Sequence, residues 1–185
     1  FEVCKIDILV GTQMVAKGLD FDNVSLVGIL NADNMLHFPD FRSYERAFQL
    51  MMQVSGRAGR KGKQGKVLIQ TYDEENKIFR MLKSYDFSAF IRMQAKDREL
   101  FNYPPYSRII KVTLKHKKRQ ILDQASYQLA VMMRKSFSNR VLGPEYPVVS
   151  RVRNYYHKHL LLKIEQESSI NKAKEILNII IQKIQ

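Results

Sequence analysis

The chain has 185 residues, and its 31 Lys and Arg against 18 Asp and Glu give a formal net charge of +13. This length fits one large domain or two small ones, and a hydrophobic content of 45% excludes a disordered chain. The first residues show no basic region followed by an apolar core, so we expect no signal peptide, and no run of about 18 apolar residues could span a membrane. The single cysteine, Cys4, excludes an intrachain disulfide and a cysteine-based zinc site within these residues. We therefore expect a cytosolic protein.

The excess of positive charge indicates a polyanionic partner, either nucleic acid or an acidic peptide. By itself it is equally compatible with a ribosomal protein, a nuclease or a membrane-surface module. The charge is unevenly spread, because residues 1–103 carry 15 basic and 13 acidic side chains, whereas residues 104–185 carry 16 and 5. The change falls at Tyr103-Pro104-Pro105, and two adjacent prolines disfavour helix. We therefore expect two domains, residues 1–103 and 104–185.

The first domain is predicted to alternate strands and helices. In chain order these are a strand at 6–10, a strand at 24–30, a helix at 44–54 ending at Gly56, a strand at 66–70, and helices at about 75–84 and 86–100. Apolar strands that alternate with helices favour an α/β fold with a parallel sheet covered on both faces. A buried strand so close to the first residue also suggests a piece of a longer protein.

The second domain has a different pattern. The expected order is a strand at 107–116, a helix at 120–137, strands at 148–152 and 159–164 joined by a turn near Asn154, and a last helix capped by Ser168 or Ser169. This β-α-β-β-α order predicts a small α+β domain with an antiparallel pair and both helices on one face.

Gly11 and Thr12 follow the first predicted strand directly. In open α/β sheets ligands bind at the carboxyl ends of strands, where backbone N–H groups and a hydroxyl suit phosphate oxygens. Glycine turns between a strand and a helix are also common where no ligand binds, so this stretch alone establishes no site.

The stretch Gln53-Val54-Ser55-Gly56-Arg57-Ala58-Gly59-Arg60 carries two arginines three apart, each preceded by glycine. Arginine offers a planar fork of donors that matches phosphate, and phosphoryl transfer requires positive charge near the γ-phosphate. If the helix continued from Tyr44, Gln53, Arg57 and Arg60 would share a face. A solvated basic helix end capped by glycine is the alternative.

Taken together, these two stretches resemble motifs V and VI of superfamily 2 helicases. The strings GTQM, AKG and DF between Gly11 and Phe21, followed by residues 31–33 and 39–46, resemble the PriA family of primosomal replication-restart DNA helicases. The resemblance continues through 62–65, 103–106 and 142–144, and it is strongest in residues 6–70. It implies that residues 1–103 are the C-terminal part of the second, RecA-like helicase lobe.

The resemblance also implies roles for individual residues. Arg57 and Arg60 would be arginine fingers that reach ATP, and Gln53 would lie near the γ-phosphate and the attacking water. Further positions are Gly18 and Asp20 in the ATP cleft, and Gly11, Thr12 and Gln13 at the phosphates of the tracked DNA strand.

Several parts of such a helicase are missing from these residues. The chain contains neither a GxxxxGK[ST] loop nor a DEx[HD] string, which belong to the first lobe that binds ATP and Mg²⁺. The zinc sites of the family use cysteines upstream of the first strand, so zinc is expected in the full-length protein but no metal here, and Cys4 is expected to be a buried free thiol. These residues alone should neither hydrolyse ATP nor unwind DNA.

Residues 104–185 would be the family's C-terminal domain, which is thought to contact branched DNA. Basic side chains attract phosphates and exposed aromatic rings stack on unpaired bases. The candidates for DNA contact are Lys111, Lys115, Arg151, Arg153, Tyr155 and Lys158. An acidic peptide would fit as well, and the acidic tail of single-stranded-DNA-binding protein is a partner of this family, as are other primosome proteins.

The resemblance thus implies an ATP-dependent, 3′-to-5′ DNA helicase that acts at stalled or branched replication forks in the bacterial cytoplasm. Two alternatives remain from the residues alone. The chain could be a non-enzymatic nucleic-acid-binding module, or its basic domain could dock an acidic tail.

Overall fold

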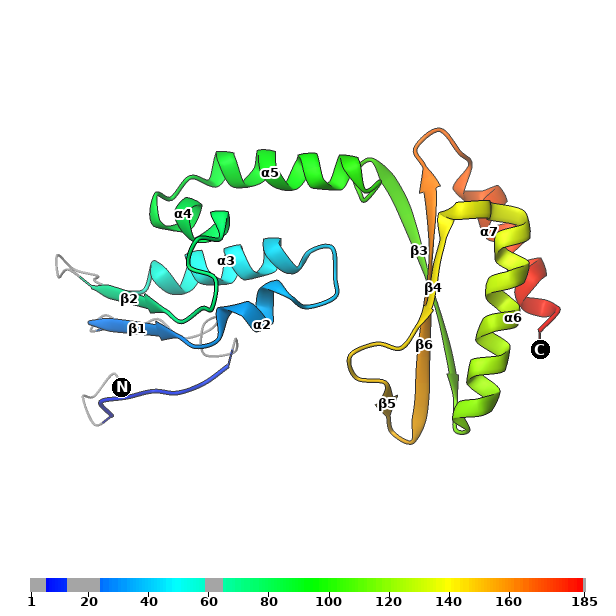
Figure 1. The fold of residues 1–185 in the computed structure, drawn as a ribbon, viewed down its shortest axis with the longest axis horizontal. Helices are drawn as coiled ribbons and strands as arrows, with labels where there is room; N and C mark the ends of the chain where they lie inside the picture. Colours follow the sequence, from blue (N-terminus) through cyan, green and yellow to red (C-terminus); the bar gives the residue numbers. More distant parts are fainter. Residues whose placement is uncertain (1–5, 13–23, 59–64, 185) are drawn as a thin grey trace. The chain divides into compact units, whose positions relative to one another are not determined.

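A computed structural model describes residues 6–12, 24–58 and 65–184. The chain divides into two compact units, Phe1–Ala95 and Lys96–Gln185, called here the first unit and the second unit. The division falls inside helix α5 (Phe87–Leu100), a few residues before the Tyr103-Pro104-Pro105 segment where the charge changes. Figure 1 shows both units, and each is described by itself.

The first unit is built on a two-stranded parallel sheet. Strand β1 (Leu26–Ile29) pairs in register with strand β2 (Lys66–Ile69), from Leu26 opposite Lys66 to Ile29 opposite Ile69. The remaining elements of this unit are α2 (Ala32–Leu36), α3 (Ser43–Ser55), α4 (Lys77–Lys83) and the first part of α5. The strands at 24–30 and 66–70 and the helices at 44–54, 75–84 and 86–100 are therefore confirmed, with shifts at their ends.

The helices form the core of the first unit with one face of this sheet. Phe48 of α3 and Phe90 of α5 stack with ring centroids 4.0 Å apart and planes 5° apart, and both side chains are buried. Ile29 and Ile69 pack against this cluster from the sheet. The opposite face exposes Leu26 and Leu68, so among the described residues only one face of the sheet is covered.

The strand predicted at 6–10 is wrong. Residues 6–12 pair with no strand among the described residues, and Ile8 and Val10 are 79% and 84% exposed. An apolar run reads as a buried strand only if neighbouring elements cover both of its faces, and the described part of the chain supplies none here. The short helix α2 was not predicted, because its five residues are too few for a helical period to show.

The second unit is an antiparallel sheet with two long helices. Its elements are β3 (Ser107–His116), α6 (Arg119–Phe137), the 3-10 turn Ser138–Arg140, β4 (Val141–Glu145), β5 (Arg151–Val152), β6 (Tyr155–Glu165) and α7 (Ile170–Gln182). Strand β6 is central, with β3 on one side and β4 on the other, and the short β5 also pairs with β6. Figure 1 shows α6 and α7 together on one face of this sheet.

Alternation along β6 decides which side chains lie under the helices. Leu160, Leu162 and Ile164 are buried and join a core with Met133 of α6 and Leu177 of α7. The predicted placement of both helices on one face is therefore confirmed.

The order of strands was predicted incompletely. Strand β4 was missed, because its sequence contains Gly143-Pro144, and glycine with proline ordinarily marks a turn. The structure accommodates both residues at a register shift between Leu142 and Glu145 on the edge of the sheet, where proline is tolerated. The strand predicted at 148–152 contracts to Arg151–Val152.

Local signals at the ends of the other elements were correct. Ser169 caps α7, and its side chain accepts a hydrogen bond from the Lys172 N–H at 3.4 Å. The turn near Asn154 is present, with positive φ values of 48° at Arg153 and 66° at Asn154, as a two-residue type I′ hairpin requires. Over the residues that the structure describes, none of the helices is long and apolar enough to cross a membrane.

Candidate nucleotide and nucleic-acid surfaces

The C-terminal end of α3 carries Gln53 and Arg57, the two candidate catalytic residues that the structure describes. Because β1 and β2 are parallel, the chain must return from the carboxyl end of β1 to the amino end of β2, and α3 makes this return. Gln53 is exposed one turn before that end, and Arg57 follows it half-buried. Both residues therefore lie at the amino-terminal edge of the sheet.

The prediction that Gln53, Arg57 and Arg60 share a helical face requires α3 to continue past Gly56, but α3 ends at Ser55. Gly56 is its C-cap, and the N–H groups of Arg57 and Ala58 continue into a turn by donating to Val54 O at 3.0 Å and Ser55 O at 3.3 Å. Arg60, the second expected arginine finger, lies outside the described residues. Of the predicted face, the structure shows Gln53 and Arg57.

The fold itself does not require glycine at position 56. Its φ is −68°, and a Cβ added there would meet only Met52 O at 3.6 Å and Gln53 O at 3.7 Å, which are ordinary van der Waals contacts. Alanine would therefore fit this helix end, which makes the position useful for separating structural from functional effects.

The residues expected at the tracked DNA strand and in the ATP cleft are mostly outside the described structure. Gly11 and Thr12 are described and exposed, but they follow no strand. Gln13, Gly18 and Asp20 lie outside the described residues.

Sequence reasoning gave no role to Asp33, which anchors the carboxyl-terminal edge of the parallel sheet. Its carboxylate accepts hydrogen bonds from Thr71 Oγ1 at 2.8 Å and from the Tyr72 N–H at 3.0 Å. Burial raises the pKa of Asp33, but these two hydrogen bonds, with its own backbone N–H and the nearby His37, lower it on balance. The position directly after β1 was the available signal, and the contact joins α2 to the chain that follows β2.

The second unit presents a sheet face away from its two helices, which we call the open face. Lys111, Thr113 and Lys115 of β3 lie on it, because the alternate residues of β3 pack against the core under the helices. On β6 the corresponding residues are Tyr155, His157 and His159, which alternate with the buried Leu160 and its neighbours. Lys111, Lys115 and Tyr155, three of the predicted DNA contacts, therefore share one surface.

The groups on the open face contact one another. The ammonium groups of Lys115 and Lys117 each lie 5.7 Å from the centre of the Tyr155 ring. His159 Nδ1 lies 3.1 Å from Thr113 Oγ1 and forms a hydrogen bond with it. The pKa of His159 is lowered, first by burial and then by the positive charge of Lys111. The imidazole is therefore held toward its neutral form.

Lys158 lies on the other side of the sheet. Its ammonium is 2.6 Å from Asp123 Oδ1 of α6 and 4.6 Å from the centre of the Tyr146 ring, and its side chain is only 13% exposed. The Tyr146 hydroxyl donates to the same Asp123 carboxylate at 2.6 Å, and these two hydrogen bonds lower the pKa of Asp123. The structure thus gives Lys158 a packing role and separates it from the open face.

The two arginines of the hairpin do not join the open face either. Arg151 pairs opposite Tyr156, and its guanidinium lies 5.2 Å from the centre of that ring. Its Nη2 also donates to Asn154 Oδ1 at 3.2 Å. Arg153 occupies the exposed turn itself. Of the basic residues predicted on the hairpin, Arg151 and Lys158 therefore lie on the helical side and Arg153 at the turn.

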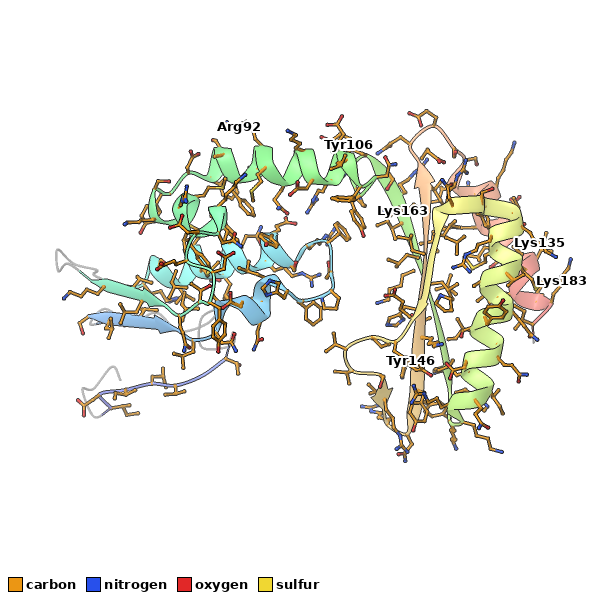
Figure 2. The ribbon with its side chains drawn as sticks, viewed as in Figure 1. Arg92, Tyr106, Lys135, Tyr146, Lys163 and Lys183 are labelled. Atoms are coloured by element: carbon orange, nitrogen blue, oxygen red, sulfur yellow. The ribbon has the colours of Figure 1, made fainter. Side chains whose placement is uncertain are left out.

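Lys163 lies at one end of the open face. Its Nζ donates to Phe101 O at 2.6 Å and lies 3.9 Å from the centre of the Tyr103 ring. Burial lowers the pKa of this lysine. Figure 2 labels Lys163 on the sheet, with Lys135 and Lys183 on the helical side of the unit. Lys163 thus ties the segment after α5 to β6.

No metal centre is formed by the part of the chain that the structure describes, where no group of three or more His, Cys, Asp or Glu could hold an ion. The four histidines were predicted to be surface or packing residues.

At the end of α3, the side chains of Gln53 and Arg57 carry the hydrogen-bond donors that a nucleotide phosphate would accept.

A parallel α/β unit that contains the GRAGR string, followed by an antiparallel basic unit, fits part of a helicase lobe with a small C-terminal domain. Family models agree, since residues 1–62 match the helicase conserved C-terminal domain and residues 99–184 match the primosomal protein N C-terminal domain. The chain belongs to the PriA family of replication restart proteins.

Relatives from distant bacteria support the assignment. Replication restart protein PriA of Bacillus subtilis is 40% identical over 176 residues, which are 94% of this chain and 22% of that protein. The protein of the same name from Thermotoga maritima is 36% identical over 177 residues, 95% of this chain and 24% of that protein. The Synechocystis protein is 38% identical over 165 residues, 88% of this chain and 20% of the relative. The chain thus spans about a fifth to a quarter of these relatives.

Proposed function

We propose that this chain is part of an ATP-dependent DNA helicase that moves 3′ to 5′ and acts at stalled or branched replication forks. In this role it would serve primosome assembly and replication restart in the bacterial cytoplasm. The family assignment and the names of the relatives support the proposal. ATP and Mg²⁺ would bind mainly to a first lobe outside these residues, and zinc would bind to another part of the full-length protein.

The proposal that these residues take part in ATP hydrolysis is supported by one observation, which is that Gln53 and Arg57 lie at the same end of α3. Gln53 presents an exposed amide that can orient a water, and Arg57 follows it at the same edge of the sheet. A guanidinium stabilises the charge that develops on the transferred γ-phosphoryl group, and in phosphoryl-transfer enzymes such an arginine accelerates the reaction by about 10³- to 10⁵-fold. Arg60 would supply a second guanidinium, with Gly18 and Asp20 lining the same cleft.

The test is DNA-stimulated ATP hydrolysis by the full-length protein. Arg57→Ala and Arg60→Ala should each lower the turnover number by about 10³-fold while DNA affinity changes little. Arg46→Ala is a matched control, because Arg46 lies on the same helix in an exposed ion pair with Asp40 at 3.1 Å, and this variant should keep normal turnover. Normal turnover in both Arg57→Ala and Arg60→Ala would refute the assignment.

The 185-residue chain alone should not hydrolyse ATP, because it has neither the GxxxxGK[ST] loop nor the DEx[HD] string. Hydrolysis by the purified chain that survives removal of contaminating ATPases would contradict this expectation.

The basic second unit would hold DNA, forked or single-stranded. Its net charge supports this role, and DNA affinity should fall as salt is added. The second candidate role for this positive charge is docking of the acidic tail of single-stranded-DNA-binding protein, or of other primosome proteins. Competition between labelled DNA and an acidic peptide for the chain distinguishes the two. A non-enzymatic binding module would be favoured if the full-length protein lacked a Walker loop.

A further inference from the structure

The open face of the second unit places a row of rings beside a row of cations. On β6, Tyr155, His157 and His159 occupy alternate positions of one face, so successive rings rise about 6.8 Å apart along the strand. On β3, Lys115 lies directly opposite His157 and Thr113 opposite His159, with Lys111 one step further. The two rows therefore run side by side along neighbouring strands.

The lysines of this face are not neutralised within the unit. Among the described residues, Lys111 and Lys115 form no ion pair with a carboxylate, and both side chains are exposed. Glu145 of β4 lies opposite His159 and places a carboxylate on this face. The face thus carries lysines along β3 and rings along β6, with Glu145 on the β4 side. A bound polyanion would place its charges toward β3.

We propose that the open face binds a single-stranded segment of DNA along β6, with bases stacked on Tyr155 and His157 and phosphates at Lys115 and Lys111. This inference rests on the proposed function, which supplies DNA as the ligand. It adds the surface of the second unit that binds the DNA and the form of DNA, a single strand, that this surface selects. Aromatic rings on a flat sheet stack on unpaired bases, while neighbouring cations hold the backbone.

The arrangement favours a single strand over a duplex. The bases of a duplex are stacked within the helix and cannot cover the ring of Tyr155, so a duplex would use the lysines alone. Thr113 holds the His159 ring through its hydrogen bond, so the surface is preformed.

An acidic peptide would not need the row of rings. Its carboxylates would bind to any accessible cations, including Arg119 and Arg151 on the helical side, where each guanidinium lies over a tyrosine ring. On the open face the lysines of β3 lie instead beside a row of rings at alternate positions of β6. At its far end Lys163 binds Phe101 and Tyr103, so a strand would lie nearer the hairpin end of the sheet.

The experiment measures binding of the 185-residue chain to a short fluorescein-labelled oligothymidylate, and to a blunt duplex of equal length, by fluorescence anisotropy at several salt concentrations. The variants are Tyr155→Ala, Tyr155→Phe and the double variant Lys111→Ala/Lys115→Ala. Tyr127→Ala and Lys135→Ala are the matched controls, because both residues lie on α6 on the helical side. Thermal melting by circular dichroism checks that each variant is folded.

We expect Tyr155→Ala to weaken binding of the single strand by about tenfold and to leave duplex affinity within about twofold, since a stacked base is lost. Tyr155→Phe should keep single-strand affinity, because the ring remains. The double lysine variant should lower the slope of log affinity against log salt concentration by about 1.4, as two phosphate contacts are removed.

Three results would overturn the inference. These are a Tyr155→Ala variant that behaves like Tyr127→Ala, an equal loss on single strand and duplex, or a chain that does not bind the single strand at all. An acidic peptide that displaces the strand equally well from the wild-type chain and from Tyr155→Ala would identify a peptide surface instead. None of these outcomes changes the expected effect of Arg57→Ala on ATP hydrolysis, so the two proposals can fail separately.

Discussion

Gly143 is the position where a single methyl group should disturb the second unit most. It lies in β4 with φ of +92°, a conformation that residues with a Cβ rarely adopt. A Cβ at this position would lie 2.6 Å from the backbone oxygen of His159 and 3.2 Å from the Glu145 N–H nitrogen. Both neighbours are main-chain atoms of a paired sheet, so neither can rotate away.

The cost of Gly143→Ala has two parts. The positive φ costs about 1–2 kcal/mol for a residue with a Cβ, and forcing a methyl group into a packed region costs about 1–3 kcal/mol. The expected destabilisation of the second unit is therefore about 2–5 kcal/mol. Because the overlap is with His159, the loss should appear first in β6, the strand that carries the rings of the open face.

Hydrogen exchange followed by mass spectrometry measures this loss in the second unit alone. A change of about 2 kcal/mol corresponds to exchange about 30-fold faster in peptides that cover β6. Gly28→Ala is the control, because a Cβ at Gly28 meets nothing within 4 Å, and its exchange pattern should match the wild type. Unchanged protection of β6 in Gly143→Ala would show that the backbone yields at this bulge, and the reasoning would be wrong.

Three further changes test other parts of the structure. Phe90→Ala removes a ring that is 2% exposed and stacked on Phe48, and urea titration should show the first unit weakened by about 3–5 kcal/mol. Gly56→Ala should leave the melting temperature of the chain unchanged or slightly raised, so that any loss of ATP hydrolysis in the full-length variant is functional; a clear drop in melting temperature would contradict the contact distances. Asp123→Asn tests the bond to Lys158. Because the folded pKa of Asp123 lies below its ordinary value of 3.8, the stability it adds is present above about pH 3.8 and is lost as pH falls through the folded pKa. The difference in melting temperature between wild type and variant should therefore shrink below that pH, and a difference independent of pH would count against the ion pair.

Much of the architecture could be predicted from local patterns. The alternation along 107–116 and the helical spacing over 120–137 identified β3 and α6, because each element buries one stripe of side chains and its period shows in the sequence. A cap at Ser168 or Ser169 was recognisable from the position before an apolar helix, and the structure has it at Ser169. The motif strings identified the family for a different reason, since they reflect chemistry at a site rather than packing.

Other features depended on contacts between distant residues. The apolar run at 6–10 has the composition of a buried strand, but a strand forms only against a neighbour, and the described residues provide none. No strand was predicted at Gly143 and Pro144, which the edge position of β4 and its register shift accommodate. No local signal connects Asp33 with Thr71, because the two meet only when β1 and β2 pair.

The sequence by itself determined that a basic segment follows a nearly neutral one, and it supplied the candidates for DNA contact. Only the tertiary structure decided which of these residues share a surface. Lys158 alternates with Leu160 on β6 and so turns toward the helices, where Asp123 of α6 binds its ammonium. Lys115 and Tyr155 turn to the opposite face and remain exposed. The period of two along a strand separates neighbours in sequence, but packing of the helices decides which side faces solvent.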